Sequence, residues 1–319
     1  MTQARAVAAE IENVVIRAGE CSLTVLPQLG AKIASLKIRG LELLQAPLAP
    51  LAPRTPSTLF DLSDASGWDE CIPSVAACVV QTPEGTASIP DHGDLWRVVW
   101  QEVAATAGSV TLRGEAFSLP LALERSIALA ETGTGWTVSL DYELTNTGSF
   151  PVPWSWAAHP LFAAEPGDQI LLPASVTALR VEGSGGNRLG PRNSTVQWPI
   201  AMLANGTHSD LSIALGPDSA VGDKLFTGPL PASDGWCTLL RPSAGIRLHI
   251  RFDPEATPYL GLWICHGGWP DRPGPKQTCI ALEPSTAPND SLAVTGPWSK
   301  TLAPGDSFNW TMQVELETL

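Results

Sequence analysis

GWTVSLDYELTN (residues 135–146) alternates apolar and polar side chains along its whole length. The apolar positions are Trp136, Val138, Leu140, Tyr142 and Leu144. A period of two puts one kind of side chain on each face of an extended chain, so this stretch predicts a β-strand with one buried face. A similar run begins at Leu121, and the two runs flank the glycine-containing sequence ETGTG (residues 131–135), which predicts a hairpin.

The same alternation recurs in residues 21–25, 34–38, 246–252 and 308–316. The 28 glycines and 29 prolines are spread along the chain, which favours short strands joined by turns over long helices. The segment QAPLAPLAPRTP (residues 45–56) predicts an extended loop, because strand-like sequence continues on both sides of it. We therefore expect an all-β protein, a large antiparallel β-sandwich, with residues 1–319 in a single domain.

The charge of the chain restricts its partners. Lys and Arg number 19 against 32 Asp and Glu, which gives a formal net charge of −13 at pH 7. Such a surface repels phosphate backbones and anionic lipids, so neither nucleic acid nor a membrane is an expected partner. The six cysteines have no zinc-ligand spacing, and we expect reduced, buried thiols and no metal site. Met1–Glu10 has no signal-peptide pattern and the uncharged run 149–164 is too short to span a bilayer, so the expected location is the cytoplasm.

Three titratable residues occur in unusual surroundings. His92 lies in the turn-rich sequence PDHGDLWR (residues 90–97), and His159 precedes a proline in WSWAAHPLF (residues 154–162). Glu283 follows an apolar run in IALEPSTAPND (residues 280–290). The structural alternative for the histidines is a hydrogen-bonded, non-catalytic role. For Glu283 the alternative is a charge at the surface end of a strand, because carboxylates are rarely buried without a partner.

Five segments resemble, in order, those of the aldose 1-epimerases, the galactose mutarotase-like proteins. GAKIASL (residues 30–36) is similar to the N-terminal strand of that family, and DHG with Arg97 resembles its H-G…R segment. AHPLF (residues 158–162) is similar to S-H-P-Y-F, and DKLF (residues 223–226) to D-x-x-F/Y. LEP with PND (residues 282–290) resembles L-E-P…P-x-D. The resemblance spans nearly the whole chain.

The resemblance implies a single-domain β-supersandwich and an isomerase of carbohydrate metabolism that interconverts the α and β anomers of a free aldose. It implies Glu283 as the general base, His159 as the general acid, and His92 as a second donor at the ring oxygen or a hydroxyl. Arg97 and Asp223 would bind or orient the monosaccharide. The family needs no metal or organic cofactor, and a homodimer is left open.

Anomer exchange by ring opening sets conditions on the catalytic pair. A base removes the proton of the anomeric hydroxyl while an acid protonates the ring oxygen. We expect burial to raise the pKa of Glu283, and neighbouring carboxylates to keep His159 protonated.

Sugars present apolar C–H faces, and the chain has twelve tryptophans against two tyrosines. We expect Trp68 and Trp263 beside the sugar, with Asp69 and Glu70 accepting hydrogen bonds from its hydroxyls, and the loop HGGWP (residues 266–270) as a further wall. Core packing of the tryptophans and a solvated carboxylate pair are the structural alternatives.

Three departures from the family pattern leave other functions open. Ala158 occupies the usual serine position, and Ala163 and Ala164 follow Phe162, where asparagine is common. GWDECIPS (residues 67–74) fills the region of an Asn-Arg pair that precedes the first histidine. The alternatives are a non-catalytic carbohydrate-binding or sensor module, a hexose-6-phosphate 1-epimerase, which needs a basic cluster at the rim, and a glycosidase or lyase with paired carboxylates.

Overall fold

The computed structural model describes residues 11–319, so Met1–Glu10, where no signal peptide is expected, lies outside the described residues. Within that range the regular structure is β-strand, interrupted by 3₁₀ turns of three residues each: η1 (Pro27–Leu29), η2 (Phe60–Leu62), η3 (Leu95–Arg97), η4 (Gly185–Asn187), η5 (Pro217–Ser219) and η6 (Ala232–Asp234). No helix in the described chain is long and apolar enough to cross a membrane. The all-β prediction is confirmed.

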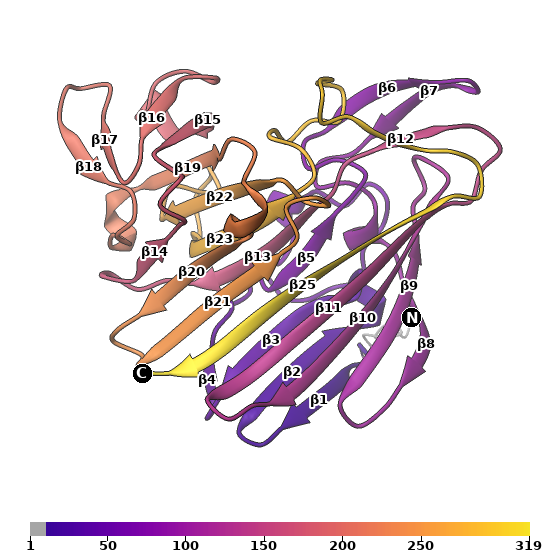
Figure 1. Ribbon diagram of the computed structural model, residues 1–319, viewed down its shortest axis with the longest axis horizontal. Helices are drawn as coiled ribbons and strands as arrows, with labels where there is room; N and C mark the ends of the chain where they lie inside the picture. Colours follow the sequence, from indigo (N-terminus) through magenta and orange to yellow (C-terminus); the bar gives the residue numbers. More distant parts are fainter. Residues whose placement is uncertain (1–10) are drawn as a thin grey trace, which may run out of the picture.

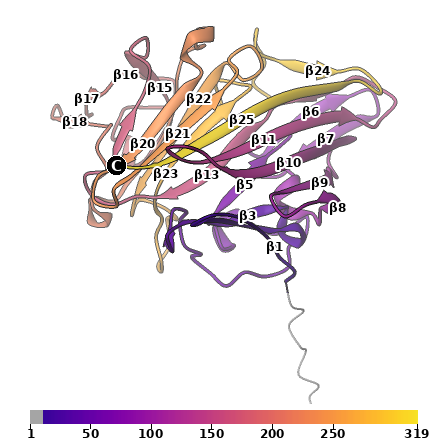
Figure 2. The same ribbon diagram turned by 60° about the horizontal axis from the view of Figure 1, so that its bottom comes forward.

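Most strands belong to two antiparallel sheets, which form two layers (Figures 1 and 2). The larger sheet has the order β1 (Val14–Ala18), β2 (Cys21–Leu26), β3 (Lys32–Ile38), β5 (Trp68–Cys71), β13 (Ala157–Ala163), β23 (Thr278–Ser285), β22 (Tyr259–His266), β19 (Val221–Phe226), β15 (Ala178–Ser184) and β16 (Thr195–Gln197), with β4 (Leu41–Glu42) beside β3. The second sheet has the order β14 (Gln169–Leu171), β20 (Trp236–Arg241), β21 (Ile246–Phe252), β25 (Ser307–Thr318), β11 (Gly135–Asn146), β10 (Leu121–Glu131), β9 (Ser109–Glu115) and β8 (Gln101–Ala105).

Three two-stranded ribbons complete the fold. They pair β6 (Cys78–Thr82) with β7 (Gly85–Ile89), β12 (Val152–Trp154) with β24 (Lys300–Leu302), and β17 (Ile200–Met202) with β18 (His208–Asp210). The six cysteines carry free thiols, and five of the six are buried, as expected.

The predicted hairpin is the centre of the second sheet. Strands β10 and β11 pair antiparallel from Leu121↔Asn146 to Glu131↔Trp136, and β25 pairs with the other edge of β11. The apolar positions of β11 are buried, since they face the interior. The other alternating segments lie in β2, β3, β21 and β25, so the strand predictions are confirmed.

A charged cluster joins the two layers inside the apolar core. The Glu70 carboxylate on β5 accepts hydrogen bonds from Arg125 of β10 (2.7 Å), Tyr142 of β11 (3.0 Å) and the Trp156 indole (2.7 Å). Because Glu70 faces the second sheet, its neighbour Asp69 faces the other way. The functional residues described below lie on that outward face of the larger sheet.

The Glu70–Arg125 pair supplies a test of the fold. Both side chains are fully buried, so Arg125→Leu leaves a charge without its partner, and we expect the free energy of unfolding to fall by about 3–5 kcal/mol. Urea denaturation measures the loss. The double variant Glu70→Gln/Arg125→Leu carries neither charge and should recover part of it; a single variant as stable as wild type would contradict this account.

Candidate active site

The central strands of the larger sheet bring His159 and Glu283 together. Strands β13 and β23 pair at Ala157↔Ser285 and Leu161↔Ala281, and this register puts His159 directly across from Glu283. Directly opposed residues point to the same face of a sheet. The His159 Nε2 atom lies 3.8 Å from Glu283 Oε1, so two residues far apart in sequence share one location.

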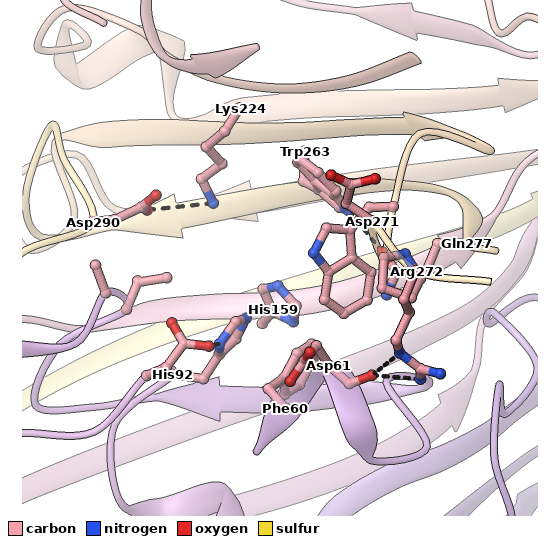
Figure 3. A pocket seen from close by; sticks show the side chains of 15 residues that line it. Phe60, Asp61, His92, His159, Lys224, Trp263, Asp271, Arg272, Gln277 and Asp290 are labelled. Carbon is pink, nitrogen blue, oxygen red and sulfur yellow. Dashed lines mark hydrogen bonds and ion pairs between the residues drawn. The ribbon is translucent and has the colours of Figure 1, made fainter. Parts of the chain in front are cut away.

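A cavity of about 480 Å³, lined in part by His159, opens on this face of the sheet (Figure 3). Its volume is within the range of small-molecule sites, which is about 300–1,000 Å³. The lining side chains come from several loops and three strands, and they combine aromatic walls with charged groups. They are Phe60, Asp61, Val75, Ala76, Asp91, His92, His159, Lys224, Trp263, Trp269, Pro270, Asp271, Arg272, Gln277 and Asp290.

His92 enters the cavity from a tight turn. Its φ of 61° is left-handed, and the following Gly93 also has positive φ and packs against the Ile72 carbonyl, where a Cβ would collide. The imidazole stacks on Phe60 with 3.7 Å between ring centroids, and Nδ1 lies 2.8 Å from an Asp91 oxygen. The ring centroid of His92 is 5.0 Å from that of His159, so both histidines reach the same space.

Arg97 fixes this turn without lining the cavity. Its buried guanidinium donates hydrogen bonds to the carbonyls of Thr58 (3.0 Å), Asp91 (2.7 Å) and Gly93. All three acceptors are backbone atoms, so the prediction of direct sugar binding by Arg97 is not supported by its position. Arg97 instead orients the segment that carries His92.

Glu283 lies beneath the cavity floor and has no exposed surface, which excludes the surface-charge alternative. Its Oε2 accepts a hydrogen bond from the Lys224 ammonium, whereas Oε1 has no hydrogen-bond partner within residues 11–319. Burial raises the pKa of Glu283, against the lowering effect of Lys224 and with help from the Asp290 charge. This agrees with the expected direction and suits a general base.

His159 behaves differently from the expectation. Burial lowers its pKa well below the usual value, and the positive charges of His92, Lys224 and Lys32 lower it further. The expectation that carboxylates keep His159 protonated is therefore wrong, because burial and these three positive charges together favour the neutral ring. A neutral ring with its proton on Nε2 also suits the buried Nδ1 atom, which finds no partner in the described structure.

Of the predicted sugar-contacting residues, Trp263 lines the cavity, as do Trp269 and Pro270 of the predicted loop. Trp68 does not: it is fully buried and packs edge-to-face against Phe162. Core packing, the structural alternative for the tryptophans, holds for Trp68.

The three predicted carboxylates are buried in ion pairs and lie outside the cavity lining. Asp69 is 2.6 Å from Lys32 and 3.4 Å from Arg54. Glu70 faces the second sheet, as described above. Asp223 binds Ser184 (2.6 Å) and Arg188 on the opposite face of β19. Their positions do not support direct contacts with a sugar, because every one of these carboxylates is already occupied.

Sequence reasoning missed Lys224 and Asp290, which line the cavity 3.5 Å apart (Figure 3). Both occur in segments that carried the family resemblance, DKLF and PND, but no role was assigned to either. Asp223 and Lys224 are adjacent on β19, so only one of them can face the cavity, but the sequence did not indicate which. Phe60, which stacks on His92, had no signal in its own neighbourhood.

The fold and the cavity define an all-β protein with a small-molecule-sized cavity lined by histidines, carboxylates and tryptophans. No model of a known protein family matches the chain, and no curated protein matches it. Solved structures do match. A protein from Synechocystis sp. PCC 6803 aligns over 100% of both chains with a TM-score of 0.72 and 14% identity.

Two further matches have descriptive names. A galactose mutarotase related enzyme from Lactobacillus acidophilus has a TM-score of 0.66 and 16% identity over 96% of this chain and 98% of its own. A galactose mutarotase-like protein from Lactobacillus casei ATCC 334 has a TM-score of 0.60 and 18% identity over 96% and 100%. The fold is therefore that of the galactose mutarotase-like proteins, which confirms the resemblance to aldose 1-epimerases at the level of the fold.

The anchoring role of Arg97 is testable. Arg97→Met removes three hydrogen bonds from a charged donor, each worth roughly 1.5–3 kcal/mol, so the His92 turn should open more often. We expect hydrogen exchange at the Asp94 amide, which donates to the Ile72 carbonyl, to accelerate at least about tenfold. Arg113→Met on β9 is the matched control. Equal exchange in both variants would show that Arg97 does not hold the turn.

Proposed function

We propose that this protein is an aldose 1-epimerase, which interconverts the α and β anomers of a free aldose. The observation that carries the proposal is the convergence of Glu283 Oε1 and His159 Nε2, 3.8 Å apart, at the floor of a sugar-sized cavity that His92 also lines. The similarity of the fold to galactose mutarotase-like structures adds support.

In the proposed reaction Glu283 Oε1 accepts the proton of the anomeric hydroxyl, and the imidazolium form of His159 donates its Nε2 proton to the ring oxygen and becomes the neutral ring. The bond between C1 and the ring oxygen breaks, and C1 becomes the aldehyde carbon of the open-chain sugar. Rotation about C1–C2 exposes the other carbonyl face, and reversal of both transfers closes the ring as the other anomer. His92 serves as a second donor. Each positioned proton transfer accelerates such a reaction by roughly 10²–10⁴-fold.

The charges around the cavity favour an unphosphorylated sugar. Four aspartates line it, Asp61, Asp91, Asp271 and Asp290, against the two cations Lys224 and Arg272. Lys224 is paired with carboxylates, and Arg272 donates to the Asp61 carbonyl (2.6 Å). A phosphate would meet net negative charge, so the hexose-6-phosphate alternative lacks the basic rim it requires. Trp263 and Trp269 supply apolar surface for the C–H faces of the ring.

The role of Glu283 is tested with Glu283→Gln. We expect this isosteric variant to lose at least about 10²-fold in anomer exchange, because a neutral amide cannot accept the hydroxyl proton. Exchange is followed by NMR on a panel of free aldoses, with sugar affinity measured in parallel and expected to change little. Full exchange by the variant would refute the assignment. Sugar binding without exchange by the wild-type protein would instead indicate a carbohydrate-binding module.

The lowered pKa of His159 predicts an unusual pH profile. A general acid must be protonated, and the pKa of an ordinary histidine is about 6.5. Since His159 in the free protein loses its proton at lower pH, kcat/KM should decline tenfold per pH unit from a point below 6.5. The profile is measured by polarimetry from about pH 4.5 to about pH 8, a range that brackets the ordinary pKa of a histidine. His159→Gln should remove this limb, and a wild-type limb above pH 7 would contradict it.

A further inference from the structure

Lys224 is the cation nearest to the proposed base, and its ammonium lies inside the cavity. It donates a hydrogen bond to Glu283 Oε2. It also lies 3.5 Å from Asp290 Oδ1 (Figure 3). The Lys224 side chain is about nine-tenths buried, with 10% of its surface exposed. A buried ammonium is stable only beside carboxylates, and the buried carboxylates are in turn stabilised by the ammonium.

A gap in the sheet allows the contact. Strand β22 lies between β19, which carries Lys224, and β23, which carries Glu283. The β22 residue opposite Glu283 is Gly261, and the β19 residue opposite Gly261 is Phe226. A Cβ on Gly261 would lie 3.0 Å from Glu283 Oε2 and 3.1 Å from Phe226. The absence of a side chain at this one position leaves room for the lysine and the carboxylate to meet across the intervening strand.

The two oxygens of Glu283 are consequently different. Lys224 occupies Oε2, whereas Oε1 faces His159 and has no hydrogen bond to any residue of the described range. A buried acceptor left unpaired costs about 1–3 kcal/mol, so an unpaired Oε1 beside His159, beneath the cavity floor, points to a ligand hydroxyl as its partner.

We propose that Lys224 is a positioning residue for Glu283. Its ammonium keeps the buried carboxylate ionised and holds Oε2, so that Oε1 alone accepts the substrate proton, while Asp290 shares the lysine and limits its effect. The inference rests on the proposed function in taking Glu283 as the base, and it adds the two residues that determine its charge and the oxygen that reacts.

The electrostatics around Glu283 agree with this division. Burial alone would lower the pKa of Lys224, but Asp290 and Glu283 outweigh it and raise the pKa, so the ammonium persists. Burial raises the pKa of Asp290, with the Glu182 charge adding to the rise and Lys224 and His92 opposing it. The other titratable groups near Glu283 are His159, His92, whose charge lowers the Glu283 pKa to a lesser extent than Lys224 does, and two thiols. Burial raises the pKa values of these thiols, Cys71 and Cys279, well above the usual value. Lys224 is therefore the dominant positive charge acting on Glu283.

The test is a comparison of two opposite substitutions. Lys224→Met removes the cation, so the pKa of Glu283 should rise by about one unit or more. Asp290→Asn removes a competing anion, so the pKa of Glu283 should fall. The Glu283 carboxyl carbon is followed through a pH titration by NMR of the full chain with ¹³C-labelled glutamate, and the signal is assigned by its loss in Glu283→Gln. The acid limb of kcat/KM should move in the same two directions, and Lys224→Arg should keep it near the wild-type position.

The control is Lys300→Met, which removes a half-buried lysine that packs on the rings of Trp154 and Phe308. An unchanged Glu283 titration in Lys224→Met, or the same direction of shift in both variants, overturns the proposal. If Lys224→Met does not fold, Asp290→Asn is the deciding variant. A rise or no change in the pKa of Glu283 in Asp290→Asn then overturns the proposal. A wild-type protein without anomer exchange refutes the proposed function, whereas the carboxyl titration still decides the role of Lys224.

Discussion

A carboxylate with no exposed surface is the constraint on which this site depends. Removing a carboxylate from water costs several kcal/mol, which a close cation, hydrogen-bond donors or a bound proton must offset. Glu283 meets the requirement with Lys224 on one oxygen and leaves the other facing His159. The strands around β23 supply the groups that surround this carboxylate. Strand β19 carries the cation, β22 has a glycine between the two, and β13 carries the imidazole. The groups beneath the cavity floor are therefore arranged around the Glu283 carboxylate.

The pleat of the larger sheet decides which predicted residues can act there. Because successive side chains on a strand point to opposite faces, a one-residue difference changes a cavity residue into a core residue. Asp223 and Lys224 illustrate this on β19, where Lys224 reaches Glu283 and Asp223 turns to Arg188. On β5, Glu70 faces Arg125 in the core while Asp69 shares the outward face with His159 but is covered by Lys32 and Arg54.

How far the sequence could predict the structure follows from these cases. Alternation over residues 135–146 was sufficient to predict the central hairpin, because a strand with one buried face has a two-residue period of apolar side chains that can be read from the sequence. The resemblance of short segments was sufficient to predict that His92, His159 and Glu283 lie close together, because the motifs occur in the same order along the chain as in the family. Neither source could tell which of two adjacent polar residues faces the cavity when a strand such as β19 is buried on both faces, because its burial has no period.

The charge state of His159 lay beyond the sequence for a further reason. It depends first on the burial of the ring and then on the charges of His92, Lys224 and Lys32, which come from different parts of the chain. Lys224, which favours a charged Glu283, disfavours a charged His159. The base and the acid of the proposed reaction are therefore coupled through one cation. The positive charge of Lys224 favours the ionised base and disfavours the protonated acid, so a loss of that charge would shift both groups toward their protonated forms. Asp290, by sharing Lys224, lies at the position where this balance can be adjusted without altering either proton-transfer residue.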